Sequence, residues 1–396
     1  MNDALTAVAR PYAARLRDIE PFRVVEVLTR AKQLARAGRD IVHLEAGEPD
    51  FTTAAPIVEA AKRALDAGAT AYSQATGLPE LREAIAGWYR QRHGVEVDPR
   101  RILVTPGASG ALLLIAGLLM NPGDGMLMTD PGYPCNRHFL RLVEGEGQLV
   151  PVGPAQRYQL NAERAEAHWR DNTVGVMVAS PANPTGEILT REELRGLSSL
   201  CRRKGGFLVV DEIYHGLSYG VDAPSILEIA DDAFVINSFS KYFGMTGWRL
   251  GWLVAPEAAV PELEKLAQNL FISMSTFSQY GALAAFEPET VAILEQRRAQ
   301  FAARRDYLLP ELRRLGFAIP HTPAGALYLY AGIQNLPSLA ADSEQFCLKL
   351  LEEHGVAITP GLDFGRHLAA QHVRFAYTTS QPRLEEAVRR LGTLFG

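Results

Sequence analysis

Short apolar runs alternate with helical segments through most of the chain. Their apolarity is nearly continuous rather than alternating, which is typical of strands that are buried on both faces. With helical segments between them, they predict an α/β fold in which helices cover a mostly parallel central sheet. The runs are R-I-L-V-T (101–105), G-M-L-M-T-D (125–130), V-G-V-M-V-A-S (174–180), G-F-L-V-V-D (206–211), F-V-I-N-S (234–238) and G-W-L-V-A (251–255).

The pattern changes on both sides of this region. Residues 15–37 have helical periodicity, with apolar residues at Val24, Val25, Leu28, Ala31 and Leu34. From about residue 285, a long charged helix leads into an α+β pattern that contains A-L-Y-L-Y-A and H-V-R-F-A-Y. We therefore expect a large domain at residues 45–284 and a smaller α+β domain formed by residues 1–44 and 285–396.

The composition narrows the class of protein. The chain has 396 residues and a formal net charge of −5, which argues against nucleic acid or an anionic membrane as a partner. Its longest apolar run, A-L-L-L-I-A-G-L-L-M, is too short to span a bilayer, and the N-terminus lacks the apolar core of a signal peptide. The three cysteines and nine histidines lack metal-ligand spacing. We expect a cytoplasmic protein without a metal site.

Polar residues gather where the predicted strands end. R-I-L-V-T runs into P-G-A-S-G and an apolar helix, so the free backbone N–H groups of that turn can hold a phosphate, although a plain turn is the alternative. Asp211 ends a strand shortly before Tyr214, and an acid there can bind a metal, cap a helix or hold a protonated ring nitrogen. Asn183 lies in the proline-stiffened turn S-P-A-N-P-T-G, which has a purely structural alternative.

The segment S-F-S-K-Y-F-G-M-T-G-W-R-L-G-W places Lys241 and Arg249 in apolar surroundings. Because a buried ammonium is costly unless it is paired or loses its charge, Lys241 either reaches water or takes part in chemistry. Ligand-binding groups of open α/β sheets collect at the carboxyl ends of strands, so one ligand can use all of these groups. G-x-G-x-x-G and G-K-[ST] motifs are absent from the sequence, which leaves a dinucleotide or Walker site with little support.

Together, S-P-A-N-P-T-G, D-E-I-Y and S-F-S-K-Y-F-G-M-T-G-W-R-L-G resemble the fold-type I pyridoxal-phosphate enzymes, and specifically the class I/II aminotransferase family. The resemblance extends from G-E-P-D-F (47–51) to V-R-F-A-Y (373–377). It implies the PLP-transferase fold type I, with pyridoxal 5′-phosphate bound by the large domain. It also implies an enzyme that moves an amino group between an L-amino acid and a 2-oxo acid by a ping-pong mechanism.

The resemblance implies roles around the ring of the cofactor. Lys241 would form a Schiff base with its aldehyde and later carry a proton between the substrate Cα and the cofactor's C4′. Asp211 would keep the pyridine nitrogen protonated. Asn183 and Tyr214 would donate hydrogen bonds to the phenolic oxygen, which tunes the pKa of the imine. Tyr133 would stack on the ring, with core packing as the alternative.

The resemblance also implies how the phosphate and the substrate are held. Tyr72 would reach the phosphate of a neighbouring subunit, which implies a homodimer with shared active sites; local packing is the alternative. Arg374 would bind the α-carboxylate of the substrate. Asn183 and Gly47 would also border the substrate, and Gly47 would leave room for it because it has no side chain. The peptide bonds before the prolines of S-P-A-N-P would be cis. The phosphate would be bound by Ala108, Ser109, Ser238, Ser240 and Arg249.

Two observations bear on the substrate. Some aspartate-preferring relatives carry a lysine in the phosphate-binding turn, where this chain has Ser109. The segment F-I-S-M-S-T-F-S-Q-Y (271–280) aligns with a loop near the substrate side chain and has no basic residue. We therefore expect a neutral or aromatic amino acid as the donor.

Other activities share the same cofactor-binding residues. Carbon–sulfur β-lyases and aminocyclopropanecarboxylate synthases use them for elimination and cyclisation, so both remain alternatives to transamination. Aminotransferase-like domains also occur in transcription regulators that sense the cofactor. The stretch before Gly47 is too short for a winged helix and linker, and the net charge is acidic, so we do not expect a regulator.

Overall fold

The computed structural model describes residues 12–337 and 341–395. Among the described helices, none has the length and apolarity needed to cross a membrane. The helices are α1 (Arg23–Arg36), α2 (Ala55–Asp66), α3 (Pro79–His93), α4 (Gly107–Leu119), α5 (Pro134–Leu142), α6 (Ala162–Ala167), α7 (Arg191–Lys204), α8 (Val260–Leu270), α9 (Thr276–Leu283), α10 (Pro288–Arg314), α11 (Ser343–His354) and α12 (Gln381–Phe395). The strands are β1 (Val42–His43), β2 (Ile102–Thr105), β3 (Gly125–Asp130), β4 (Glu146–Pro151), β5 (Thr173–Ala179), β6 (Phe207–Asp211), β7 (Phe234–Ser238), β8 (Gly251–Val254), β9 (Tyr328–Gly332), β10 (Val356–Ala357), β11 (Thr359–Pro360) and β12 (His372–Ala376).

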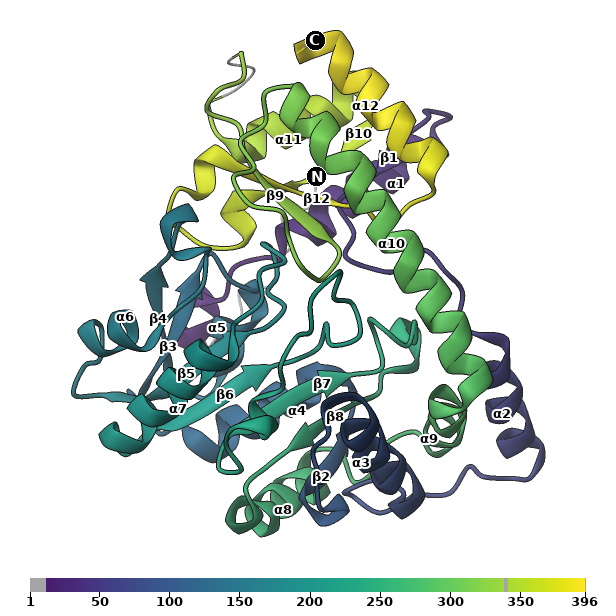
Figure 1. Cartoon of the computed structure of the whole chain (residues 1–396), viewed down its shortest axis with the longest axis vertical. Helices are drawn as coiled ribbons and strands as arrows, with labels where there is room; N and C mark the ends of the chain where they lie inside the picture. Colours follow the sequence, from purple (N-terminus) through teal and green to yellow (C-terminus); the bar gives the residue numbers. More distant parts are fainter. Residues whose placement is uncertain (1–11, 338–340, 396) are drawn as a thin grey trace, which may run out of the picture.

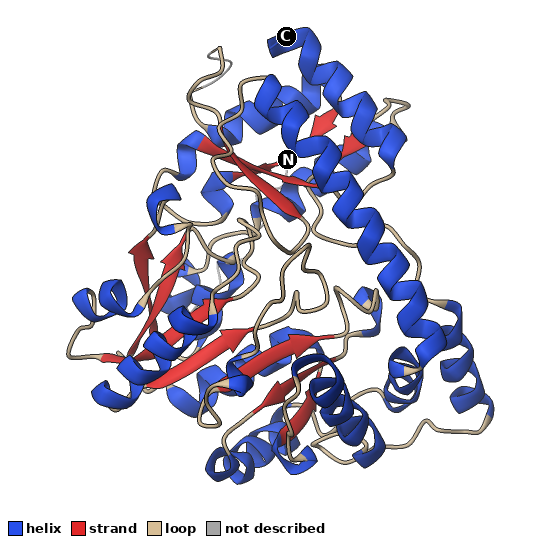
Figure 2. Ribbon diagram, in the orientation of Figure 1, coloured by secondary structure: helices blue, strands red, loops and turns tan. Residues whose placement is uncertain are grey.

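A seven-stranded sheet forms the centre of the larger part of the molecule (Figures 1 and 2). Its order is β2-β8-β7-β6-β5-β3-β4. Strand β8 is antiparallel to both of its neighbours, and the other neighbouring strands are parallel. The prediction of a mostly parallel sheet in an α/β fold is confirmed.

Both faces of this sheet are buried, as the continuous apolar runs predict. Successive side chains of a strand point to opposite faces. On one face, Met177 and Val209 belong to a core cluster with residues of α4 and α8. On the other face, Val178 and Val210 belong to a cluster with residues of α3 and α7.

The sequence analysis did not predict the edge strand β4. Its sequence, E-G-Q-L-V-P, alternates buried and more exposed positions and contains only two large apolar side chains. Because one face of β4 is more exposed, the near-continuous apolar signal of strands that are buried on both faces is missing.

A second group of elements lies at the other end of the long helix α10 (Figure 1). Strands β11, β12 and β9 form an antiparallel sheet, and β1 pairs with β10 in parallel. The division of the chain into domains at residues 45–284 and at 1–44 with 285–396 stays a prediction, and residues 1–11 lie outside the described residues.

The N-terminal region differs from the helix expected at residues 15–37. A short 3₁₀ helix (Ala14–Asp18) and α1 are separated by a segment that contains Pro21. Proline lacks an amide hydrogen and disfavours the helical conformation of the residue before it, so the two pieces do not join. The break lets the start of α1 approach the ends of the central strands.

Candidate active site

The carboxyl ends of three central strands meet at a cavity of about 330 Å³. Asp211, the last residue of β6, is aligned with Ala179 of β5 and Ile236 of β7. The segments that follow these strands therefore emerge side by side. The cavity is lined by most of the predicted site residues, namely Gly47, Ala108, Ser109, Tyr133, Asn183, Asp211, Tyr214, Ser240, Lys241, Arg249 and Arg374.

Two predicted site residues are not among those that line the cavity. Ser238 is buried behind Ser240, with its Oγ 2.9 Å from the Oγ of Ser240 and 3.0 Å from the carbonyl oxygen of Leu250. Tyr72 is 81% exposed at the surface. The Ser238 hydroxyl therefore contacts Ser240 rather than lining the cavity.

Lys241 faces the cavity from the segment after β7. Its Nζ donates a hydrogen bond to the carbonyl oxygen of Gly47 at 2.7 Å and lies 6.0 Å from the ring centre of Tyr214. The side chain is partly buried rather than enclosed by apolar groups. A primary amine held by one carbonyl at the edge of a cavity remains available to an aldehyde.

Asp211 is a buried acid, and few interactions stabilise its charged form. Burial raises its pKa to about 6, against the opposing effects of the Ile213 backbone N–H, which donates to Oδ1 at 3.0 Å, and of the Lys241 charge. A cationic ring nitrogen beside this carboxylate would favour the charged form. The residue therefore suits a protonated pyridine.

Another part of the cavity, at the start of α4, suits a phosphate group. Helix α4 begins at Gly107 without a side-chain cap, so its first N–H groups are free to bind an anion. The guanidinium of Arg249 lies against this turn, since a Cβ at Gly107, whose φ is +71°, would lie 2.5 Å from Nη2. Ser109 and Ser240 add hydroxyl groups to the same wall.

Arg374 forms the third polar group of the cavity. Its Nη1 donates to Oδ1 of Asn183 at 3.0 Å and its Nη2 to the carbonyl oxygen of Glu45 at 2.6 Å. The buried Nε has no hydrogen-bond partner among the described residues. Such an unsatisfied donor on a permanent cation suits a carboxylate.

These groups fit pyridoxal 5′-phosphate and an amino acid together. The cavity holds an amine for the aldehyde, an acid for the ring nitrogen, an anion-binding helix start for the phosphate and an arginine for the carboxylate. The cis peptide bonds expected before Pro181 and Pro184 are confirmed, and a third lies between Asp130 and Pro131.

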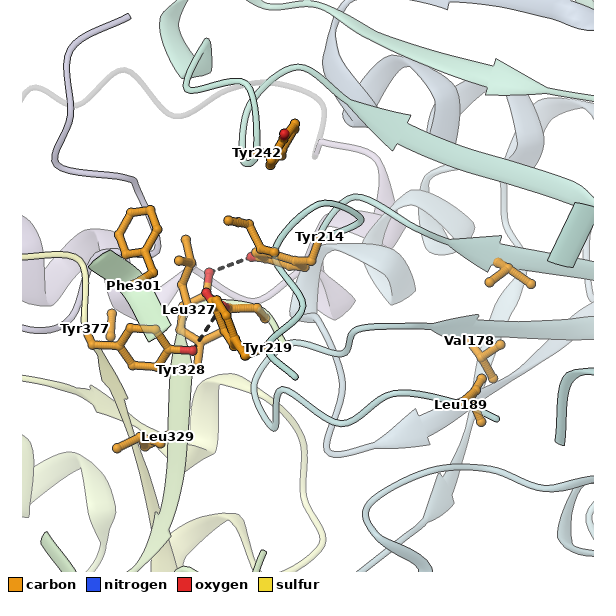
Figure 3. Close-up of a cluster of buried hydrophobic side chains, with 14 of the residues drawn as sticks. Val178, Leu189, Tyr214, Tyr219, Tyr242, Phe301, Leu327, Tyr328, Leu329 and Tyr377 are labelled. Atoms are coloured by element: carbon orange, nitrogen blue, oxygen red, sulfur yellow. Dashed lines mark hydrogen bonds between the residues drawn. The ribbon is translucent and has the colours of Figure 1, made fainter. Parts of the chain in front are cut away.

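The sequence analysis did not identify Tyr328 as a site residue. It lies on β9, lines the cavity, and has its hydroxyl oxygen 2.6 Å from that of Tyr214 (Figure 3). In the run A-L-Y-L-Y-A, Tyr328 and Tyr330 look alike, as aromatic residues of a strand. Only the tertiary structure shows that Tyr328 lines the cavity and Tyr330 does not.

The expected position of residues 271–280 near the substrate side chain stays a prediction. Residues 271–280 are not among those that line the cavity of their own chain, and the Thr276 hydroxyl donates to the carbonyl oxygen of Ala71. Within the chain, an apolar wall of the cavity comes from α1 and the residue before it. The side chains of this wall are Phe22, Val24, Val25 and Leu28.

Comparisons with known proteins identify the family of this chain. A model of the family "Aminotransferase class I and II" matches residues 39–391. The chain is 40% identical over 377 residues to the valine–pyruvate aminotransferase of Mycobacterium tuberculosis, covering 95% of this chain and 96% of that protein. It is 33% identical to the (5-formylfuran-3-yl)methyl phosphate transaminase of Methanocaldococcus jannaschii, covering 95% and 97%.

A solved structure of an aminotransferase from Mycobacterium tuberculosis is 39% identical, with a TM-score of 0.93 and coverage of 98% of this chain and 99% of that chain. The likeness therefore extends over the fold as well as the motifs. The chain belongs to the class I and II aminotransferase family and is a pyridoxal-phosphate-dependent aminotransferase.

Proposed function

We propose that the enzyme holds its cofactor through Nζ of Lys241 and moves an amino group between a neutral L-amino acid and a 2-oxo acid in two half-reactions. When bound, the cofactor supplies an electron sink for the charge that develops at the substrate Cα. The observation that carries the proposal is the convergence of Lys241, Asp211 and Arg374 on one cavity.

The residues divide the work in this proposal. Arg374 orients the α-carboxylate of the substrate, and the freed amine of Lys241 moves the proton from Cα. Asp211 keeps the ring nitrogen protonated. Asn183 and Tyr214 donate hydrogen bonds to the phenolic oxygen, and Tyr133 covers the ring.

The phosphate has its own set of partners in the proposal. Arg249 supplies a permanent charge, and the start of α4 supplies free N–H groups. The Ser240 hydroxyl donates a hydrogen bond to the phosphate. The Ser238 hydroxyl orients Ser240 by a hydrogen bond to its Oγ. Ala108 and Ser109 contribute the first turn of the helix.

A neutral donor is supported by the way charges are distributed around the cavity. Among the described residues that line it, the side-chain cations are Lys241, Arg249 and Arg374, and each already has a proposed partner. None of these three is left for a side-chain carboxylate. The wall formed by Phe22, Val24, Val25 and Leu28 instead offers apolar surface to an aliphatic side chain. A relative of this chain is also named for valine.

A panel of amino acids tests this preference. In single-turnover measurements, L-valine and L-alanine are expected to convert the bound cofactor to its amine form at least about tenfold faster, per molar, than L-aspartate, because an unpaired carboxylate in the apolar wall costs more than 1.4 kcal/mol. L-Phenylalanine measures how large a neutral side chain the cavity accepts. A faster reaction with L-aspartate would contradict the proposal.

The proposed enzyme is a homodimer with shared active sites. Tyr72 is exposed, and so are Ile272, 53% accessible, and Phe277, 37% accessible. The Thr276 hydroxyl donates to the carbonyl oxygen of Ala71 at 2.6 Å, which joins the two segments. Phe277 also shares a surface depression with Arg249. This apolar surface therefore adjoins the phosphate end of the cavity, where Tyr72 of a second copy would bind.

Replacing Tyr72 with phenylalanine is expected to raise the dissociation constant of the cofactor about tenfold, the effect of one lost hydrogen bond to a charged group. Tyr12→Phe is the matched control, because Tyr12 is similarly exposed at 76%. Cofactor titration of the apoenzyme and sedimentation velocity provide the measurements. A monomer at micromolar concentration, or equal affinities for the two variants, would count against shared sites.

We also propose that the enzyme works in the cytoplasm. Its three cysteines, Cys135, Cys201 and Cys347, are all free thiols, which persist in a reducing compartment. Cell fractionation against compartment markers measures this, and recovery with an oxidising compartment would contradict it.

A further inference from the structure

Tyr328 and Tyr214 both line the cavity, and their buried hydroxyl groups are hydrogen-bonded to each other (Figure 3). Their oxygens lie 2.6 Å apart, and both side chains are almost completely buried. Tyr328 also fits closely against Gly47, because a Cβ at that glycine would lie 2.0 Å from the Tyr328 hydroxyl oxygen. The two hydroxyls are therefore held in place by the surrounding structure.

The direction of this hydrogen bond follows from counting hydrogens. Each tyrosine hydroxyl has one hydrogen to donate and can also accept. Burial, the largest effect, raises the pKa of Tyr214 well above its usual range, so the group is protonated at neutral pH. If Tyr214 donates to the phenolic oxygen of the cofactor, its hydrogen is used there. The hydrogen between the two oxygens must then come from Tyr328.

We propose that Tyr328 is a positioning residue whose hydroxyl donates to Tyr214 and directs the Tyr214 proton at the phenolic oxygen of the cofactor. This inference depends on the role given to Tyr214 in the proposed function. In a chain of hydrogen bonds, a donor that itself accepts a bond becomes a stronger donor. Tyr328 therefore helps to stabilise negative charge on the phenolic oxygen.

The ring of Tyr328 has a second, separable task. The guanidinium of Arg374 lies 4.2 Å from its ring centre and 4.8 Å from that of Phe364, so the cation is held between two aromatic rings. This contact orients Arg374 for the carboxylate of the substrate. A single side chain thus supports both the cofactor end and the substrate end of the site, and its hydroxyl and ring can be removed separately.

The first experiment removes only the hydroxyl. In Tyr328→Phe, the pH midpoint of the absorbance change of the bound cofactor, measured without substrate, is expected to rise by about half to one unit, because loss of the donor weakens the Tyr214 bond to the phenolic oxygen. Tyr330→Phe is the matched control. It lies two residues further along the same strand, is buried, and its hydroxyl has no hydrogen-bond partner among the described residues. It should leave the midpoint unchanged.

A double-mutant cycle separates this inference from the proposed function. Tyr214→Phe should raise the midpoint further than Tyr328→Phe, and the double variant should match Tyr214→Phe. If Tyr214→Phe has no effect, the proposed contact of Tyr214 fails. If Tyr214→Phe raises the midpoint and Tyr328→Phe does not, or if the two shifts add fully, Tyr328 does not act through Tyr214.

The second experiment removes the ring. Tyr328→Leu is expected to raise the KM for L-valine about tenfold beyond the value of Tyr328→Phe, which keeps the cation–π contact with Arg374. Equal KM values in the two variants would show that the Tyr328 ring does not orient Arg374 for the substrate. Circular dichroism and Tm identify any variant that fails to fold, and Tyr328→Phe tests the hydroxyl independently of that outcome.

Discussion

Lys241→Ala is expected to lower the rate of transamination by at least about 10⁴-fold, at the upper end of what a lost general base costs. The variant removes both the amine that holds the cofactor and the group that moves the substrate proton. The cofactor should still bind, more weakly, because Arg249, the start of α4 and Asp211 remain in the cavity. Steady-state rates with L-valine and equilibrium cofactor binding are the measurements.

Lys265→Ala is the control for a lost lysine. Lys265 is exposed and forms an ion pair with Glu262 on α8, so its removal should leave the rate unchanged. A rate near that of the unmodified enzyme in Lys241→Ala would refute the assignment of Lys241. A parallel loss in Lys265→Ala would show that a general effect on the protein is being measured.

Asp211→Asn is expected to lower kcat by about 10³-fold, which corresponds to about 4 kcal/mol of transition-state stabilisation. Asparagine has the shape of aspartate but lacks the charge that keeps a pyridine nitrogen protonated. The ring then accepts electrons less well, while the bonds to the phosphate remain. Single-turnover rates with L-valine, measured at saturating cofactor, separate this effect from weaker binding.

The neighbouring acid provides the control for Asp211. Glu212 is fully buried, accepts hydrogen bonds from Ser225 and Ile226, and is not among the residues that line the cavity. Burial raises its pKa to about 8, and glutamine has the same shape as glutamate. Glu212→Gln should keep kcat within about threefold. A similar loss in both variants would mean that Asp211 has no special electrostatic role.

The sequence contains most of the information on the central sheet and on the ends of its strands. Strands buried on both faces, such as β5 and β6, appear in the sequence as nearly continuous apolar runs. Asp211 could be placed because it directly follows such a run. Strand β4 could not, since one of its faces is more exposed and its apolar signal is weak.

The missing parts of the site depend on contacts between distant segments. The periodicity of α1 predicts an apolar face, but it does not say that Val24 and Val25 line the same cavity as Lys241. Tyr328 and Arg374 meet because β9 pairs with β12, and strand pairing is not visible in either strand alone. Likewise, the motif S-F-S-K does not reveal that Ser240 faces the cavity while Ser238 lies behind it.

Reduction of the purified yellow enzyme with borohydride, followed by proteolysis and mass spectrometry, tests the central claim most directly. Borohydride fixes an imine as a stable secondary amine, so the account predicts one peptide that carries the cofactor mass on Lys241. Recovery of that mass on another lysine such as Lys265, or an unmodified Lys241 in fully reduced enzyme, would contradict it.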